Sequence, residues 1–174
     1  MSLGSLIAVA IAEAFRGDGE ILASPMGPMP SLGVSLARHT FEPDLVCTDG
    51  VGHLIDIDGR REGWMPYRRV FDTVWWGRRH VMMGASQIDQ WGRQNISAIG
   101  PHNQPKVQLL GVRGAPGNTV HHTTSYWVPR HSNRVFVPDV DVISGVGPRD
   151  GAHEIRAIIT NLGVLDTSGP DGRL

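Results

Sequence analysis

The chain has little of what marks a secreted, membrane or nucleic-acid-binding protein. It contains a single cysteine, Cys47, which excludes an internal disulfide framework and fits a reducing cytoplasm. Its formal net charge is −1, and no basic stripe or charged block points to nucleic acid or to a charged tail. No run of residues approaches the roughly 18 apolar positions that a membrane span requires. We therefore expect a cytoplasmic protein that binds neither a membrane nor nucleic acid.

The N-terminal stretch SLIAVAIAEAF is apolar but does not read as a signal peptide, since no Lys or Arg precedes it and Glu13 interrupts it. The rest of the composition is ordinary for a globular protein, with 40% hydrophobic and 19% charged residues. The 174 residues are enough for one domain with a real core. Because no internal repeat or boundary is visible, we expect a single domain over residues 1–174.

Hydrophobic periodicity predicts three helices. Apolar residues from Leu6 to Phe15 recur at helical spacing, and Gly17 follows as a stop. A second helix is expected over residues 31–40, with Ser31 as its cap. A third is expected over residues 66–77, because Pro66 suits the first position of a helix. Its apolar stripe consists of Tyr67, Val70, Phe71, Val74 and Trp75.

Short apolar runs predict strands over residues 21–24, 44–50, 80–89, 106–111, 134–144 and 154–166. A hairpin is expected around Asp58-Gly59, and Pro138 places an edge or a bulge in its strand. Continuous apolar strands beside amphipathic helices indicate an α/β layered fold with a mostly parallel sheet.

The stretch LLGVRGAPGNTVHH, residues 109–122, spaces three glycines as G-x-x-G-x-x-G after an apolar run. Glycines allow main-chain N–H groups to approach a ligand, and ligands collect at the carboxyl ends of strands. The spacing is neither that of the dinucleotide fingerprint nor that of the P-loop. On its residues alone the stretch is either a turn-rich connection or a ligand-binding loop.

The histidines and the candidate nucleophiles carry no recognised spacing. His121 and His122 would point to opposite sides of a strand, and the other histidines show no H-E-x-x-H or Cys/His pattern. Ser86 does not sit in the G-x-S-x-G elbow of the common serine hydrolases. Cys47 is most simply a small buried hydrophobic residue. We expect no metal site.

Two stretches in this order carry a resemblance to a known family: MGASQIDQWGRQNIS, residues 83–97, and GVRGAPGN, residues 111–118. They resemble the β subunits of the family I coenzyme A transferases, in which a strand, a Q-[VI]-D-x-x-G-N-x-N turn and a Gly-rich loop follow one another. The matching residues are Gln87, Ile88, Asp89, Gly92 and Asn95, while Gln94 departs from the pattern. Over residues 62–101 and 111–128 the chain is most similar to the branch of actinobacterial steroid (cholesterol) ring-cleaving CoA-thioester hydrolases.

The resemblance implies an α/β/α layered CoA-transferase-like fold and an active site at the interface with a partner α subunit. It also implies a CoA thioester as substrate, no permanently bound cofactor and an α2β2 heterotetramer. The Gly-rich loop would present main-chain N–H groups to the thioester oxygen. On that reading the substrate-binding residues of this loop are Gly114, Ala115, Gly117 and Asn118. Since interfaces favour aromatic residues, candidates for the partner-facing surface, or for the core, are Trp64, Trp75, Trp76 and Trp127.

One departure from the family decides the expected chemistry. The transferases use a glutamate after the second strand as nucleophile, and here Thr48 occupies its place, with Asp49 next to it. A carboxylate must reach its acyl carbon at about 3–3.5 Å, so a shift of one residue matters. We expect Thr48 and Asp49 to line the substrate site, and Asp49 to be a turn residue before Gly50.

Three functions stay open. The first is hydrolytic C–C cleavage of the ring of a CoA thioester in steroid degradation; no residue of this chain stands out as the general base, which we expect from the α subunit. The second is CoA transfer with Asp49 as an irregular nucleophile, and the third is a non-catalytic subunit that stabilises its partner. Family β subunits continue past NLGVLDTSGPDGRL, so we also expect this chain to be short at its C-terminus.

Overall fold

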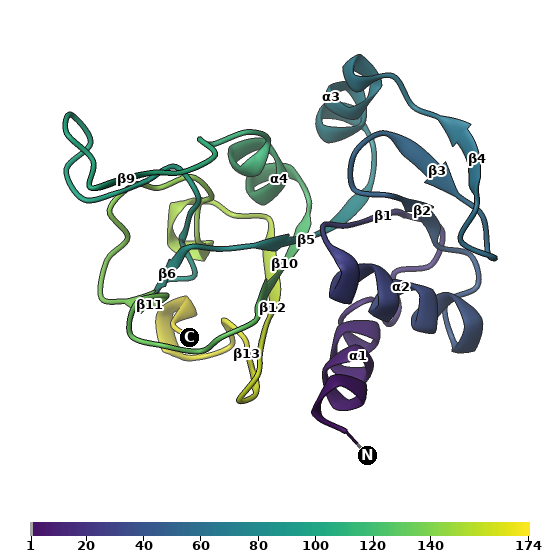
Figure 1. Ribbon diagram of the computed structural model, residues 1–174, viewed down its shortest axis with the longest axis horizontal. Coiled ribbons are helices and arrows are strands. Elements are labelled where there is room, and N and C mark those ends of the chain that lie inside the picture. The colour runs from purple at the N-terminus through teal and green to yellow at the C-terminus, as the bar shows by residue number, and fades with distance from the viewer. Residues whose placement is uncertain (1) are drawn as a thin grey trace. The chain divides into compact units, whose positions relative to one another are not determined.

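The computed structural model describes residues 2–174 and consists of two compact units, the first ending at Met83 and the second beginning at Gly84 (Figure 1). A single domain over residues 1–174 stays a prediction, and the two units are described in turn. Within the described residues, no helix is both long enough and apolar enough to cross a membrane.

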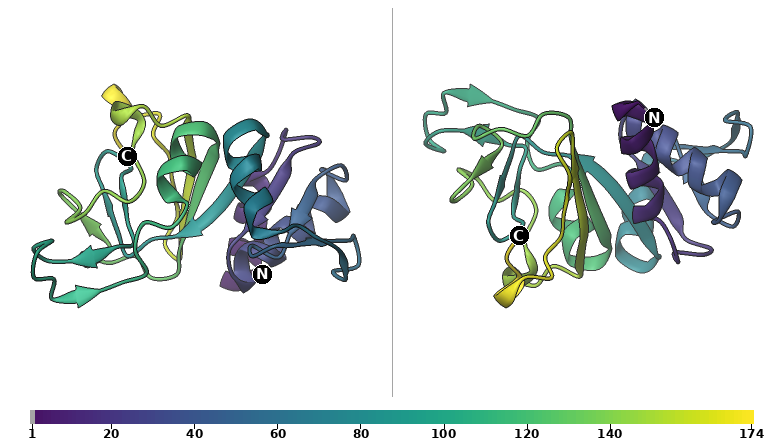
Figure 2. Two further views of the ribbon diagram at one scale, coloured as in Figure 1. Left: turned by 90° about the horizontal axis from the view of Figure 1, so that it is seen from above. Right: turned by 90° about the horizontal axis from the view of Figure 1, so that it is seen from below.

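The first unit contains three helices, α1 (Leu3–Ala14), α2 (Pro28–Thr40) and α3 (Tyr67–Trp76). Helix α1 packs against α2, and Gly33 makes this possible: a Cβ there would lie 2.2 Å from Ile11 Cγ2 (Figures 1 and 2). The predicted helix at the N-terminus is confirmed, with Ser2 accepting from the Ser5 N–H, but Leu6 is exposed rather than part of the buried face. The core side of α1 comprises Ile7, Ala8, Ile11, Ala12 and Ala14.

Helix α2 begins earlier than the sequence suggested. Gly27, with φ at +116°, is the residue before its first turn, and Pro28 starts the helix. Ser31 as the cap was therefore wrong, because proline at a first helical position fixes the start upstream. The predicted helix over residues 66–77 is present as α3, which begins at Tyr67 and ends at Trp76, so Pro66 precedes it and is not its first residue. Apart from Trp75, the side chains of its predicted stripe lie outside the described part of the structure: Tyr67, Val70, Phe71 and Val74.

The strands of the first unit are β1 (Leu22–Pro25), β2 (Val46–Thr48), β3 (His53–Ile55), β4 (Arg61–Trp64) and β5 (Arg79–Gly84). They lie in the order β5-β1-β2-β3-β4. Strand β1 is parallel to β2 and to β5, with Leu22 opposite Val46 on one side and Arg79 on the other. The β3–β4 pair is the predicted hairpin, and Gly59 adopts φ of +82° in its turn.

The second unit holds β6 (Gln87–Asp89), β7 (Gln94–Asn95), β8 (Ala98–Ile99), β9 (Val107–Gln108), α4 (Ala115–His121), β10 (Thr123–Val128), β11 (Phe136–Val137), β12 (Glu154–Thr160) and β13 (Val164–Leu165). Single 3₁₀ turns span Pro148–Asp150 and Pro170–Gly172. Strand β12 is parallel to β10 and antiparallel to β13, and β6 lies between β11 and β7. The β8–β9 pair projects from the rest of this unit (Figures 1 and 2). The central pairs of both units are parallel, as predicted for an α/β fold.

Several predicted strands of the second half differ from the structure. Residues 80–89 form two strands with a break after Gly84, and the strands expected over 106–111 and 134–144 shrink to two residues each. Leu110 is 74% exposed and lies beyond Val107 and Gln108, the two residues of this run that pair with β8. Residues 154–166 form the hairpin β12–β13. His121 and His122 do not lie on a strand: they end helix α4.

Candidate active site

Thr48 stands at the carboxyl end of β2 and is buried in a small hydroxyl network. Its Oγ1 donates to Ser24 Oγ over 3.3 Å and accepts from the Gly50 N–H over 3.2 Å. Arg79 Nε donates to the same Ser24 oxygen over 2.9 Å, and burial lowers the pKa of this guanidinium to about 10. The Thr48 hydroxyl proton is thus directed at Ser24, so the network fixes this side chain at the end of the strand.

Asp49 follows immediately, and both of its carboxylate oxygens have partners. Oδ1 accepts from the main-chain N–H groups of Val51, Gly52 and His53 at 2.9, 2.9 and 3.1 Å. Oδ2 lies 2.8 Å from Nδ1 of His53. Burial raises the pKa of this carboxyl, but the hydrogen bonds outweigh burial and hold its pKa well below the usual value. This geometry favours Asp49 as the cap of the β2–β3 turn, because a nucleophilic carboxylate would have to leave these partners.

A cavity of about 270 Å³ opens beside this corner, within the first unit. It is bounded by helix α2, the end of β2 and the β3–β4 hairpin, and both Thr48 and Asp49 line it. Other parts of its wall are Val34, Arg38, Cys47, Ile55 and Ile57. The predicted residues of the β2 corner therefore lie at a concave, mostly apolar site, the kind of surface that binds small molecules.

Arg38 is a member of this wall that sequence reasoning missed. Its Nη1 donates to the main-chain carbonyls of Ile55 and Asp56 at 3.1 and 2.8 Å, which ties helix α2 to the hairpin. An isolated arginine on a helix has no motif to reveal it. Cys47, beside it, is buried and free, as predicted; burial raises the pKa of its thiol to about 11, opposed by Arg38, so the thiol stays protonated at neutral pH.

The Gly-rich stretch of the second unit is not the loop that the sequence suggested. Gly114 precedes the first turn of α4, and Ala115, Gly117 and Asn118 lie within the helix, since Pro116 fits its first turn. The Ala115 N–H donates to the Val112 carbonyl and the Asn118 N–H to the Gly114 carbonyl. Within the described residues, the N–H groups of Gly114 and Gly117 have no hydrogen-bond partner. These two donors at a helix start can bind an oxygen that carries negative charge.

The motif that carried the resemblance forms a buried turn. Asp89 Oδ1 accepts from the N–H groups of Trp91 and Arg93, and Gly92 takes φ of +72° between them. Asn95 Nδ2 donates to Gln87 Oε1 over 2.7 Å. These side chains hold the β6–β7 turn in shape, so their chemistry is structural rather than catalytic.

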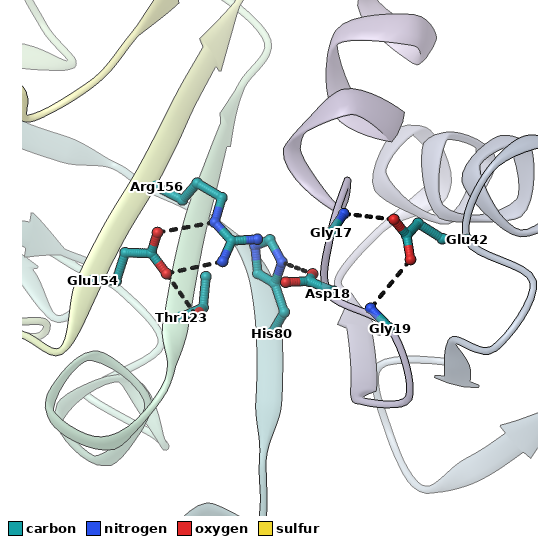
Figure 3. A network of polar contacts seen from close by, with 8 residues as sticks. All are labelled: Gly17, Asp18, Gly19, Glu42, His80, Thr123, Glu154 and Arg156. Carbon is teal, nitrogen blue, oxygen red and sulfur yellow. Dashed lines mark hydrogen bonds and ion pairs between the residues drawn. The ribbon is translucent and has the colours of Figure 1, made fainter.

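Other polar contacts are shared between elements within each unit (Figure 3). In the first unit, His80 and Asp18 form a buried pair at 2.6 Å under the ring of Phe15, and Glu42 accepts from the N–H groups of Gly17 and Gly19. In the second unit, Glu154 accepts from Thr123 and Arg156, its neighbours on β10 and β12 (Figure 3). These contacts stabilise the arrangement of strands and turns within each unit. None of these residues lines the cavity beside Thr48.

No protein-family model matches the chain. A curated relative does: the cholesterol ring-cleaving hydrolase IpdB subunit of Rhodococcus jostii (strain RHA1) is 52% identical over 178 aligned positions, which cover 94% of this chain and 70% of the relative. The chain belongs to the IpdB subunit family.

Two further comparisons support the family and its fold. The crystal structure of Rhodococcus jostii RHA1 IpdAB superposes with a TM-score of 0.93 at 49% identity, covering 99% of this chain and 75% of that one. One subunit of the 3-oxoadipate CoA-transferase of Pseudomonas knackmussii is 28% identical over 95% of this chain and 72% of its own length. The predicted resemblance and the predicted α/β CoA-transferase-like fold class are thereby confirmed.

Proposed function

We propose that the chain is the β subunit of a heteromeric enzyme that opens a carbon ring of a CoA thioester by hydrolysis, in the degradation of steroids. The observation that carries this proposal is the 52% identity to a cholesterol ring-cleaving hydrolase subunit across nearly the whole chain. The substrate brings the coenzyme A, so the chain needs no resident cofactor for this reaction.

The geometry of the β2 corner supports hydrolysis over CoA transfer. Thr48 replaces the nucleophilic glutamate that the resemblance to the transferases implies, and the Asp49 carboxylate is held by three main-chain N–H groups and His53. A covalent acyl-enzyme needs a carboxylate free to attack. We assign both residues to the wall of the substrate site instead.

The role of the second unit in catalysis follows from the start of α4. Negative charge develops on the thioester oxygen as a neighbouring carbanion forms, and preorganised N–H donors lower the barrier to that step. We assign this role to the N–H groups of Gly114 and Gly117, with Ala115 and Asn118 shaping the same turn. Water must be activated by a general base, and we assign the base to the partner α subunit.

We infer that the α subunit covers a surface of this chain on which tryptophan side chains are exposed. Trp64, Trp75 and Trp76 are 72%, 61% and 83% exposed, and Trp127 is half-buried. Exposed tryptophans at this density mark interaction surfaces. We propose that Trp64, Trp75 and Trp76 contact the α subunit in an α2β2 heterotetramer; a cytoplasmic location stays a prediction.

A second candidate, CoA transfer, is favoured by the 28% identity to a subunit of a CoA-transferase. One experiment separates the candidates: co-expression with the α-subunit gene, then incubation with ring-containing CoA thioesters, with and without a carboxylate acceptor. Hydrolysis predicts a product one water heavier that keeps its CoA, and no dependence on the acceptor. Acceptor-dependent formation of a new CoA thioester supports transfer, and full activity of the α subunit alone supports a non-catalytic role.

A further inference from the structure

Helix α3 and strand β4 form a part of the first unit's surface that is both aromatic and basic. Helix α3 lies on the side of β1 and β2 away from α1 and α2, so those two helices do not cover it (Figures 1 and 2). Tryptophan and arginine are the residue types that contribute most binding energy at protein interfaces. Six exposed side chains define this Trp–Arg surface: Trp64, Trp75, Trp76, Arg61, Arg68 and Arg78.

The cations of this surface exceed its carboxylates. Residues 61–78 contain four exposed arginines and two carboxylates, a balance of +2, whereas the whole chain carries −1. One arginine of the four, Arg69, is paired with Asp72 at 3.4 Å. Within the described part of the chain, no carboxylate lies within ion-pair distance of the three arginines of the Trp–Arg surface. The surface therefore presents positive charge that a partner can neutralise.

Cations and rings share one side of α3. Arg68 and Trp75 are seven residues apart, as are Arg69 and Trp76, and seven residues are two turns of a helix. A helix that lies on a membrane separates these types, with the arginines in water and the aromatic rings in lipid. A side on which both types are mixed and exposed fits a protein surface instead, one with an apolar centre and carboxylates around it.

A second copy of this chain is a poor occupant for the same surface. Two copies related by a two-fold axis would bring the same patch of each chain together. The positive balance of residues 61–78 would then face itself, and like charges in an interface cost binding energy. A different chain with the opposite charge meets no such penalty.

We propose that the Trp–Arg surface recognises the α subunit by charge as well as by apolar contact, and that the matching face of the α subunit carries carboxylates around an apolar centre. The inference rests on the proposed function and adds to it the chemistry of the partner's surface. Attraction between opposite charges at the rim of an interface weakens as salt screens it, whereas apolar contact does not.

The test uses the chain co-purified with its α subunit as a complex. Dissociation on dilution is followed by analytical ultracentrifugation in about 0.1 M and about 1 M NaCl, between which the screening length falls from about 10 Å to about 3 Å. The variant is the double substitution Arg61→Gln and Arg68→Gln, which removes charge from β4 and α3. Arg130→Gln with Arg134→Gln is the matched control, because these arginines of the second unit are also exposed and have no ion-pair partner among the described residues.

The dissociation constant of the natural complex is expected to rise about tenfold between the two salt concentrations. At the lower concentration the Arg61/Arg68 variant should bind the α subunit about 3- to 30-fold more weakly than the natural chain, as for two charge pairs at an interface rim. It should also lose most of the salt dependence, while the control stays within about twofold of the natural chain and keeps that dependence.

Three outcomes overturn the inference while the heteromer itself stands: a natural complex that salt does not weaken, an Arg61/Arg68 variant that assembles as tightly as the natural chain, or equal losses in the variant and the control. If circular dichroism shows that the variant does not fold, the salt dependence of the natural complex decides alone.

Vesicles of phosphatidylserine and phosphatidylcholine serve as the second probe. Binding of the natural chain to these vesicles that the Arg61/Arg68 variant loses, with assembly unchanged in both, would mean that the Trp–Arg surface faces a membrane, and it overturns the inference. A chain that forms no complex with the α subunit at any salt concentration contradicts the proposed function itself.

Discussion

Replacing Asp49 with alanine tests most directly whether its carboxylate has a structural role or acts as a nucleophile. Asp49→Ala removes the acceptor of three main-chain N–H groups and the partner of His53. The side chain is 24% exposed, so water replaces part of what is lost. A capping aspartate contributes about 0.5–2 kcal/mol, and we expect a loss near the upper end, about 2 kcal/mol of the free energy of unfolding. In a protein of this size that lowers the melting temperature by roughly 4–8 °C.

The pH dependence of this loss has a definite sign. Because the pKa of Asp49 is depressed in the folded state, its contribution is present above the ordinary value of 3.8 and is lost as the pH falls through the lower, folded-state pKa. Urea denaturation at pH 7 should therefore show the full difference between the natural chain and Asp49→Ala, and the difference should close below about pH 4. Asp58→Ala is the control, since that carboxylate is exposed and should change stability by less than about 0.5 kcal/mol.

Activity of the same variant completes the test. As a turn cap, Asp49 shapes the cavity only indirectly, so the folded Asp49→Ala complex should keep its turnover within about tenfold. A catalytic nucleophile would cost about 10⁴-fold or more at unchanged stability. A CoA thioester on Asp49 of the natural protein would refute the reasoning; mass spectrometry would detect it as the alcohol that borohydride leaves, or the hydroxamate that hydroxylamine leaves, on this side chain.

Four further outcomes are expected. Thr48→Glu restores the carboxylate of the transferases and should give at best a weak CoA adduct, visible by trapping and mass spectrometry; a strong adduct would show that the corner is preorganised for transfer. Gly114→Val should lower turnover about 10²- to 10³-fold with folding retained, since a Cβ there meets only Asn118 Nδ2 at 3.5 Å; unchanged turnover contradicts the donor role. Trp76→Ser should weaken binding of the α subunit by at least about tenfold in titration calorimetry, and equal affinity would move the interface elsewhere. Gly33→Ala should cost about 1–3 kcal/mol in denaturant unfolding because its Cβ overlaps Ile11, and a neutral result would mean that α1 and α2 can separate.

What the sequence predicted well depends on neighbours in the chain. The helices at Leu3–Ala14 and Tyr67–Trp76 follow from local periodicity, and the hairpin follows from the positive φ that Gly59 supplies. The apolar runs over 106–111 and 134–144 were misjudged, because a strand exists only where a partner strand is available. The Gly-rich stretch is helical because proline in a first turn outweighs nearby glycines.

The same distinction between contacts with chain neighbours and contacts with distant residues applies to the residues of the candidate site. Thr48 and Asp49 could be placed at the end of a strand from their own segment, and the structure puts them at a cavity. Arg38 and Ser24 could not be found, because their roles arise from contacts with residues far along the chain: Arg38 with the carbonyls of Ile55 and Asp56, and Ser24 with Arg79. No local pattern encodes such contacts.

The position of β1 between β2 and β5 has a consequence for how the protein is made. Leu22 needs Val46 on one edge and Arg79 on the other, so β1 leaves the ribosome well before its second partner has been synthesised. Until then its open edge exposes unpaired main-chain groups beside apolar side chains, which is a template for aggregation. Pairing at long sequence separation is also slow. Nascent chains stalled before residue 79 should therefore depend on chaperones, whereas chains that extend past β5 can close the first unit.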